Sequence, residues 1–568
     1  MNPFLAAGLS VILSLSASCE KTPDTAGGND DNDTIPARVT DVQKTPTIGK
    51  DDNGFRLAWD YSTEKKLMDR GGYARILRLQ DGSYILATED HSSNVVVRKS
   101  KDGVQWDNKI IVFSPSQEGG VSANACNAEV FQMSDGTLIC GANYRPVSEG
   151  KASWSIAVSR SFDNGEHWEE PKIIYRAGMK GADGCWEPCF LQLPSGELQV
   201  YFANEGPYTT SSEQEISMLR SYNKGTTWST SATKVSFRAG KRDGMPVPRI
   251  VEDEIVVAIE DNKVGEFKPY TVRCKISDNW SSYVSADSKN REYALADTEI
   301  PTSAYLGAPY LLVLPGGKTL LSYQTTVDRN SNWELSCMEV AVGDETARNF
   351  EILSRPFNVG NDREGKWNSL AIWDENSVVA VSSTNKDGAA VAPWMKVGHV
   401  MDKIRVSASS LQDKKFFVGS KGITRAFAGI SVSGGKMKIS SDVYDNDISD
   451  KDGIWFYIDP INNSYGGPYA GIFKIWASRS GEVTVWEGNN GTWQEIDPAL
   501  VNVKAGKMSS EDGYVIDAEL DASVFAPGKT FRFALGLAAY SAGGSGYNEM
   551  LDRALDTKPC SWMRVNID

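Results

Sequence analysis

Two glutamates occupy positions from which paired carboxyl chemistry is possible. Glu187 opens a short hairpin between Trp186 and Pro188, and Glu260 closes another hairpin at the end of the apolar run 256–259. Cleavage of a glycosidic bond needs one carboxyl group to protonate the leaving oxygen and a second to act as nucleophile or to activate water. Two carboxyls brought to one mouth could do this chemistry, whereas a lone rim acid would simply pair with a neighbouring cation.

A repeat in the chain explains how two distant hairpins could meet. Short strand pairs recur about two-residue turns, with successive spacings of 54, 60, 58, 63 and 59 residues; the turns begin at Asp81, Asp135, Ser195, Asp253, Gly316 and Glu375. A period near 60 residues with several strands per repeat is typical of a β-propeller, and six turns predict six blades. Equivalent strand ends of successive blades converge at one mouth.

A second repeated motif lies between the hairpins. Residues 161–168 fit the pattern S-x-D-x-G-x-x-W, residues 221–228 fit it with Asn for Asp, residues 100–106 are a shorter form, and residues 277–280 are a remnant. The acid or amide caps a tight turn, the glycine takes a positive φ, and the tryptophan is expected to pack under the next blade. The motif is therefore predicted to be structural, and His167 within it to be a surface residue.

These Asp boxes on a six-fold repeat resemble the sialidase-like superfamily over about residues 55–400. From residue 401 the boxes vanish, and alternating strands such as 453–459 indicate a β-sandwich. Residues 436–459 and 559–565 resemble a carbohydrate-binding module of family 9. We therefore predict an all-β chain, with a six-bladed propeller over 55–400 and a sandwich domain over 401–568.

The predicted sandwich holds two groups of side chains with alternative roles. Four tryptophans could stack on sugars or could pack in the core: Trp455, Trp476, Trp486 and Trp493. Four aspartates could bind Ca²⁺ or form a solvated loop, and their spacing fits no EF-hand: Asp445, Asp447, Asp450 and Asp452. With three histidines in total and no metal-ligand spacing among the cysteines, neither a metal site nor a cofactor is predicted.

The N-terminus suggests a secreted, anchored protein. Residues 4–18 are apolar and of signal-peptide length, and the small residues before Cys19 resemble a bacterial lipobox. This resemblance implies a signal peptide over 1–18, an acylated Cys19 and an outer-membrane lipoprotein that faces the periplasm or the exterior. The polar composition that follows predicts a disordered tether within 19–54.

The charge and the aromatic content narrow the range of binding partners. The formal net charge is −15 with both signs interspersed, which argues against nucleic acid. Aromatic residues make up 10% of the chain and include 16 tryptophans, which favours an oligo- or polysaccharide. We expect a monomer.

The two glutamate hairpins carry a closer resemblance. A W-E-P hairpin at Glu187 followed by a G-M-P hairpin that ends in Glu260 resembles glycoside hydrolase family 93, the exo-α-1,5-L-arabinanases. The resemblance implies a retaining hydrolase, with Glu187 as acid/base and Glu260 as nucleophile or the reverse. It also implies a catalytic tyrosine, for which Tyr310 is the first candidate and Tyr305 the second, with Tyr323 as a third.

Two other functions stay open. The residues expected to contact substrate are Arg75, Asp90, Trp186, Arg249, Tyr305 and Tyr323. An exo-α-sialidase would instead need a tyrosine nucleophile, an aspartate and three clamping arginines, for which Arg75, Arg249 and Arg273 are candidates and Glu89 and Asp90 form an alternative acid site. A surface lipoprotein that binds glycans without cleaving them is the third possibility.

Overall fold

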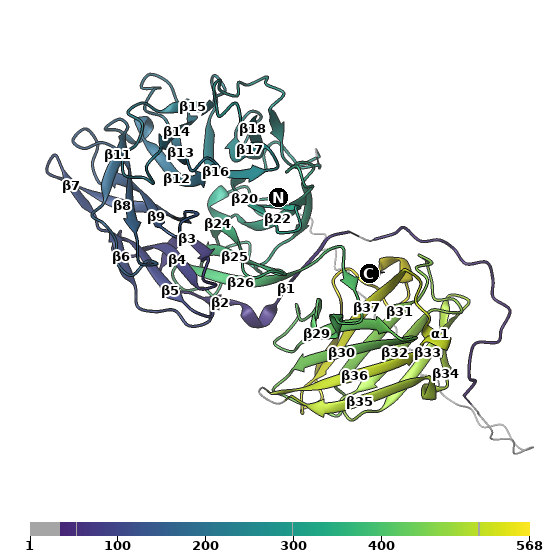
Figure 1. The fold of residues 1–568 in the computed structure, drawn as a ribbon. Helices are drawn as coiled ribbons and strands as arrows, with labels where there is room; N and C mark the ends of the chain where they lie inside the picture. Colours follow the sequence, from purple (N-terminus) through teal and green to yellow (C-terminus); the bar gives the residue numbers. More distant parts are fainter. Residues whose placement is uncertain (1–34, 53, 298, 509–511) are drawn as a thin grey trace, which may run out of the picture.

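The structure, a computed structural model, describes residues 35–568 except 53, 298 and 509–511. The predicted signal peptide and Cys19 lie outside the described residues. The described chain forms two bodies of antiparallel sheet, a six-bladed propeller followed by a β-sandwich (Figure 1), so the predicted fold class is confirmed. Within these ranges no helix is long and apolar enough to cross a membrane.

Each propeller blade is a four-stranded antiparallel sheet that runs outward from its first strand in chain order. The first and second blades are β3 (Gly71–Arg78), β4 (Tyr84–Asp90), β5 (Val95–Ser100) and β6 (Ile110–Phe113), and β8 (Val121–Gln132), β9 (Leu138–Pro146), β10 (Ser155–Ser161) and β11 (Lys172–Arg176), with β7 (Ser116–Glu118) paired to β8. The third and fourth are β12 (Cys185–Gln192), β13 (Leu198–Asn204), β14 (Glu215–Ser221) and β15 (Thr233–Ser236), and β16 (Asp243–Val251), β17 (Glu254–Asp261), β18 (Lys268–Lys275) and β19 (Arg291–Tyr293). The fifth and sixth are β20 (Leu306–Val313), β21 (Thr319–Thr325), β22 (Cys337–Gly343) and β23 (Glu351–Ser354), and β24 (Gly365–Ile372), β25 (Ser377–Thr384), β26 (Ala392–Met401) and β1 (Arg56–Trp59), with β2 (Lys65–Lys66) also paired to β26. The N-terminal β1 pairs with β26, so the start of the propeller closes its last blade.

Every inner strand carries a β-bulge at the same place, where two of its residues face one residue of the second strand. The first bulge residue has a positive φ of 49–57° in all six blades: Tyr73, Asn127, Glu187, Met245, Ala308 and Trp367. Such a conformation costs roughly 1–2 kcal/mol for a residue other than glycine. Its recurrence in all blades indicates that the bulge is needed to re-aim side chains toward the mouth.

The bulge also explains the proline motifs. Pro188, Pro246 and Pro309 occupy its second position, where the ladder is interrupted. Proline within a sheet is tolerated at such a place because it has no N–H to donate. The W-E-P and G-M-P sequences therefore report the local shape of the inner strand as well as any chemistry.

The Asp boxes form turns as predicted. In the first box Gly165 N donates to Ser161 Oγ at 2.9 Å and Trp168 Nε1 donates to the Gly165 carbonyl at 3.1 Å. His167 lies at the surface with its ring 90% exposed. The predicted packing direction was wrong, because Trp168 packs on a core shared with the preceding blade, and a Cβ on Gly165 would lie 3.1 Å from Ile85 of that blade.

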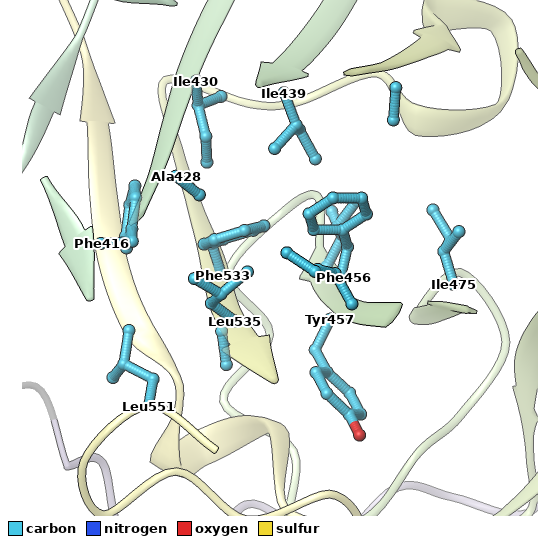
Figure 2. Packing of buried hydrophobic residues seen from close by; sticks show 14 of the residues in the cluster. Phe416, Ala428, Ile430, Ile439, Phe456, Tyr457, Ile475, Phe533, Leu535 and Leu551 are labelled. Carbon is cyan, nitrogen blue, oxygen red and sulfur yellow. The ribbon is translucent and has the colours of Figure 1, made fainter. Parts of the chain in front are cut away.

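The C-terminal body consists of two packed sheets. The first contains β27 (Arg405–Val406), β39 (Met563–Ile567), β37 (Thr530–Tyr540), β31 (Gly453–Asp459), β32 (Phe473–Ser478), β33 (Val483–Asn489) and β34 (Thr492–Ile496), with β38 (Gly546–Met550) paired to β37; the second contains β28 (Phe416–Val418), β29 (Arg425–Ser433), β30 (Lys436–Tyr444), β36 (Gly513–Asp521) and β35 (Val501–Lys507). In Figure 2, Ala428, Ile430 and Ile439 of the second sheet face Phe456 and Phe533 of the first, within one buried cluster. Alternating apolar residues of both sheets thus form a sandwich core.

Short helices occur in the connections. They are α1 (Ala522–Phe525) and the 3₁₀ turns η1 (Tyr61–Thr63), η2 (Gly181–Asp183), η3 (Trp333–Leu335), η4 (Ser410–Gln412), η5 (Pro498–Leu500) and η6 (Pro559–Ser561).

The second half of the predicted tether is fixed to the sandwich. Arg38 makes two hydrogen bonds to the buried Glu487 carboxylate, at 2.7 and 2.6 Å, and Asp51 pairs with the buried Arg532 at 2.8 Å. In Figure 1 this purple segment runs beside the sandwich before the chain enters the propeller. Ion pairs between residues far apart in the chain therefore hold this part of the predicted tether against the sandwich.

Candidate active site

A ring of side chains surrounds the propeller mouth at the end of each second strand. Each of these residues lies on the second strand of its blade, opposite the inner-strand residue that precedes the bulge. They are Glu89, Asn143, Ala203, Glu260, Gln324 and Ser383. Four of them accept the N–H of the bulge residue in the next blade, at 2.6 Å for Glu89, 2.8 Å for Glu260, 2.8 Å for Gln324 and 2.9 Å for Ser383. Because a bulge leaves an N–H without a ladder partner, this fold requires polar side chains at its mouth.

The third blade departs from this pattern. Its ring residue is Ala203, which has no acceptor, and the bulge N–H of Met245 instead donates to Glu187 Oε2 at 3.4 Å. Glu187 is itself the bulge residue of β12 and reaches the mouth from an inner strand, whereas Glu260 reaches it from a second strand. Two neighbouring blades thus supply one carboxyl each.

Both carboxyls approach the peptide unit between Gly244 and Met245. Glu187 binds the N–H of Met245, and a Cβ on Gly244 would lie 2.9 Å from Glu260 Oε1. With standard backbone dimensions, this path limits the separation of the carboxyls to about 10 Å. The limit agrees with the spacing of glycosidase carboxyl pairs, which is about 5–9.5 Å.

Both carboxyls are half-buried and resist ionisation. Burial raises the pKa of Glu187 to about 7, against the opposing charge of Arg145, the N–H of Met245 and the charge of Arg242. Burial also raises the pKa of Glu260 to about 7, against the N–H of Ala308, and the nearby charge of Glu187 raises it further. Near neutral pH one of the two carboxyls can therefore be protonated while the other is ionised.

Trp186 forms a wall beside this pair. Its Nε1 donates to Glu205 at 2.8 Å, and Glu205 accepts two bonds from Arg242 at 3.0 and 2.9 Å. The Arg145 guanidinium lies 4.9 Å from the centre of the indole ring. These contacts fix the ring next to Glu187.

A cavity of about 420 Å³ opens in front of Glu187. Its lining includes Tyr73, Glu89, Arg145, Trp186, Glu187 and Trp367. Sequence analysis missed Tyr73, Arg145 and Trp367 as site residues. The bulge position, eight residues before each turn, identifies Tyr73 and Trp367 as equivalents of Glu187.

Both residues of the alternative acid site, Glu89 and Asp90, line the cavity, but they differ in their environment. Burial raises the pKa of Glu89. Asp90 is committed to its own loop: burial would raise its pKa, but the 2.7 Å ion pair with Lys109 and hydrogen bonds from Asn94 and Ser92 lower it to about 2. The carboxylate of Asp90 is thus fully engaged by protein groups.

The tyrosine beside the pair is Tyr305, the second candidate from the sequence. A Cβ on Gly307 would lie 2.2 Å from the Tyr305 hydroxyl and 2.6 Å from Glu260 Oε2, so both oxygens approach the same point. The Tyr310 hydroxyl instead donates to Glu129 at 3.3 Å, and Tyr323 is buried and donates to Glu339 at 3.1 Å. The structure therefore places Tyr310 and Tyr323 away from Glu260.

The predicted arginines also lie elsewhere. Arg75 is 3% exposed and pairs with Glu129 at 3.1 Å, and Arg249 lies over the Tyr310 ring at 5.3 Å. Arg273 pairs with Glu254 at 3.3 Å, at the turn end of its blade. The three do not converge on the cavity, because Arg75 and Arg249 follow their bulges and point into the layer beneath the mouth.

The close approach at Gly307 yields a test of the site geometry. Gly307→Ala should displace Tyr305 or Glu260 and lower kcat by about 100-fold, because misplacement by about 1 Å is enough for such a loss. Gly316→Ala in the same blade is the matched control, since its Cβ would meet no atom within 4 Å. Steady-state kinetics on the best substrate would check this, and equal activity of the two variants would contradict the geometry.

Comparison with known proteins gives one family match. A family model described as a BNR repeat-like domain matches residues 147–289, which contain both complete Asp boxes. No curated protein matches the chain.

Several solved structures are similar to parts of the chain. The GH93 α-L-arabinofuranosidase of Fusarium graminearum with arabinobiose is 17% identical, and the match covers 59% of this chain and 97% of that one with a TM-score of 0.47. The NanB sialidase from Streptococcus pneumoniae is 12% identical over 60% of this chain and 69% of that one, with a TM-score of 0.41. A carbohydrate-binding module of family 9 from Caldicellulosiruptor kristjanssonii with cellotriose is 13% identical over 29% of this chain and 94% of that one, with a TM-score of 0.24.

Proposed function

We propose that the propeller is a retaining glycoside hydrolase that cleaves an oligo- or polysaccharide with Glu187 and Glu260. The observation that carries this proposal is the pair itself: two half-buried carboxyls with a pKa of about 7 that both approach the Gly244–Met245 peptide at the mouth. Perturbed carboxyls in a cavity are a mark of acid–base sites. They favour catalysis over glycan capture alone.

The hydrogen bonds support a division of roles. Glu260 accepts a 2.8 Å bond from Ala308 N, whereas Glu187 accepts a longer one, 3.4 Å, from Met245 N. A hydrogen bond to the ionised form favours ionisation. Glu260 is therefore assigned as the nucleophile and Glu187 as the general acid/base.

The reaction then has two steps. Glu187 protonates the glycosidic oxygen while Glu260 attacks the anomeric carbon, which forms a covalent glycosyl-enzyme. Glu187 next removes a proton from water, and the water displaces Glu260 with net retention. Tyr305, next to Glu260, can hold the carboxylate in place through its hydroxyl. Specificity for α-1,5-linked L-arabinofuranose rests on the W-E-P and G-M-P resemblance.

The sandwich is assigned a glycan-binding role. The ring centre of Trp455 lies 4.7 Å from that of Trp476 and 5.6 Å from that of Trp486. Trp455 lies on the face of β31 opposite the core residues Ile454 and Phe456. A cluster of half-buried rings on an outer sheet face can stack on sugars. Of the aspartates of the possible calcium loop, Asp452 accepts the N–H of Tyr540 at 2.8 Å, and the described residues include no group of three metal-ligand side chains.

Anchoring through Cys19 in the outer membrane remains part of this proposal. The segment that follows the predicted anchor first contacts the sandwich, through Arg38. On this proposal the sandwich is the domain nearer the membrane, and the propeller mouth receives glycan.

Incubation with linear arabinan, sialyllactose and a panel of plant and host glycans tests the function. The expected result is release of short arabinose products from arabinan, detected by chromatography. Release of sialic acid would instead establish the sialidase function. Measurable binding without any product would favour the non-catalytic function.

The pH dependence of activity should be bell-shaped, because turnover needs one ionised and one protonated carboxyl. Arg145 opposes protonation of Glu187, as does Arg242, while Glu205 favours it. Arg145→Gln removes one opposing charge and raises the pKa of Glu187, so the alkaline limb of kcat/KM should move to higher pH. Lys224→Gln, at an exposed Asp box, should leave the profile unchanged. An alkaline limb that moves to lower pH would contradict the assignment of Glu187 as the acid.

A further inference from the structure

Four aromatic residues form a continuous arc on the Glu260 side of the mouth. The ring centres of Phe267 and Tyr305 are 6.3 Å apart, those of Tyr305 and Trp333 are 5.9 Å apart, and those of Trp333 and Trp367 are 6.3 Å apart. The arc spans the fourth, fifth and sixth blades. We call it the aromatic arc.

Trp333 is the exposed centre of this arc. This residue is 40% exposed, whereas the other tryptophans among the described residues are buried or half-buried. It begins η3, where the Asn332 side chain caps the turn by accepting Glu334 N at 3.1 Å. A large ring held in solvent by a capped turn points to a binding role rather than to packing.

The rings are held in place from below. Lys366 is 7% exposed, lies 5.0 Å from the Trp333 ring and 6.0 Å from the Trp367 ring, and pairs with Glu334 and Glu364. A buried cation paired with two carboxylates thus contacts both indoles, while Trp333 keeps 40% of its surface exposed. Fixed rings lose little conformational entropy on binding.

The arc connects directly to the catalytic pair. Gln324 accepts the N–H of Trp367 at 2.8 Å and donates to the Tyr305 hydroxyl at 3.2 Å, which links two arc residues. Tyr305 lies beside Glu260, and Trp367 also lines the cavity in front of Glu187. A chain that leaves the cavity along this side would therefore pass over Trp333.

We propose that the aromatic arc is a stacking subsite for the sugar residues that extend outside the cavity. This inference rests on the proposed function and deepens it: the protein binds several successive sugar residues of its substrate, not only one terminal sugar. Sugar rings present flat apolar faces that match indole and phenyl rings, and their hydroxyls stay solvated at the rim. The buried Lys366 is paired with two carboxylates, the exposed Glu334 and the half-buried Glu364, so the three groups carry a net negative charge, which disfavours an anionic glycan and suits an uncharged one.

The test measures binding separately from cleavage. In full-length protein that carries Glu260→Gln, calorimetry would give the Kd of α-1,5-linked arabinobiose and arabinohexaose. The hexaose is expected to bind more tightly than the biose. Trp333→Ala should weaken hexaose binding by about tenfold or more and leave biose binding within about twofold, since tenfold is about 1.4 kcal/mol. Trp333→Phe should retain most of the hexaose affinity, because a smaller ring still stacks.

Tyr222→Ala is the matched control, since Tyr222 is 77% exposed on an Asp box away from the mouth. It should change neither affinity. Equal losses for both oligosaccharides in Trp333→Ala, no loss for either, or no binding of either sugar would overturn the inference. If no glycan of the panel is cleaved but Trp333→Ala selectively weakens hexaose binding, the proposed catalysis fails and the stacking subsite stands.

Discussion

Replacing Glu260 with glutamine is expected to lower kcat by roughly 10⁴-fold or more and to leave substrate affinity nearly unchanged. The reason is that the nucleophile acts in the transition state, whereas the cavity walls and the aromatic arc bind the ground state. Glu187→Gln should cause a similar loss on natural substrates, which need a proton on the leaving oxygen. Single-turnover kinetics and calorimetry on both variants would measure the two effects separately.

Two controls separate lost chemistry from lost structure. Glu266→Gln, an exposed glutamate near the same blade, should keep full activity. The pKa of Glu260 is about 7 in the folded protein, above the ordinary value near 4.3 for an unfolded chain. The protonated carboxyl stabilises the folded protein relative to the ionised carboxyl. This stabilisation is fully present below the unfolded pKa and is lost as the pH rises through 7. Glutamine keeps its proton, so Glu260→Gln should be at least as stable as the wild type at pH 8. A Glu260→Gln protein that keeps more than a tenth of wild-type kcat would contradict the role.

The second large effect concerns stability. Arg291 donates to Asp243 at 2.6 Å and to Asp261 at 2.8 Å, and both aspartates are 0% exposed. Arg291→Met would leave two buried carboxylates without this partner, and we expect a loss of about 3–5 kcal/mol in the free energy of unfolding. Chemical denaturation monitored by tryptophan fluorescence would measure it.

This network also supports the site, because Asp243 precedes Gly244 and Asp261 follows Glu260. Arg291→Met should therefore reduce activity as well as stability. Arg348→Met is the control, since Arg348 is 34% exposed and its 3.1 Å ion pair with Glu292 should contribute only about 0–1 kcal/mol. Equal effects of the two substitutions would show that burial does not set the strength of these pairs.

The fold and the glutamate pair could be read from the sequence because both follow from local repeats. The hairpin turns recur with the same spacings as the bulge residues at the mouth. Glu187 lies near the start of the inner strand β12 and Glu260 near the end of the second strand β17, and in an antiparallel pair these two ends lie at the same rim. The blade that closes the ring is less visible, since β1 pairs with β26 across almost the whole propeller.

The bulge explains why Tyr305, and not the first candidate Tyr310, lies beside Glu260. Tyr305 precedes the bulge at Ala308 and Tyr310 follows it. Side chains alternate between the two faces of a regular strand, but a bulge inserts one residue and changes the alternation. Counting residues from Glu260 or from a motif therefore cannot tell which tyrosine faces the mouth.

Other parts of the site depend on long-range contacts. Trp333 lies on a 3₁₀ turn between β21 and β22, outside the strand pattern, and only its distance to Trp367 and Tyr305 reveals its place. The segment from Arg38 to Asp51 was predicted only as part of a tether, because its partners Glu487 and Arg532 lie more than 400 residues away. Charge pairs at such separations leave no local signal in the sequence.

The most direct test of the central claim is the configuration of the product formed with azide. An activated aryl glycoside of the released sugar would be incubated with each glutamate variant and sodium azide, and the glycosyl azide would be analysed by proton NMR. If Glu260 is the nucleophile and Glu187 the acid/base, Glu260→Ala should yield the azide of inverted configuration and Glu187→Ala the azide of retained configuration. The opposite pattern would exchange the two roles, and no azide product from either variant of an active enzyme would contradict the pair.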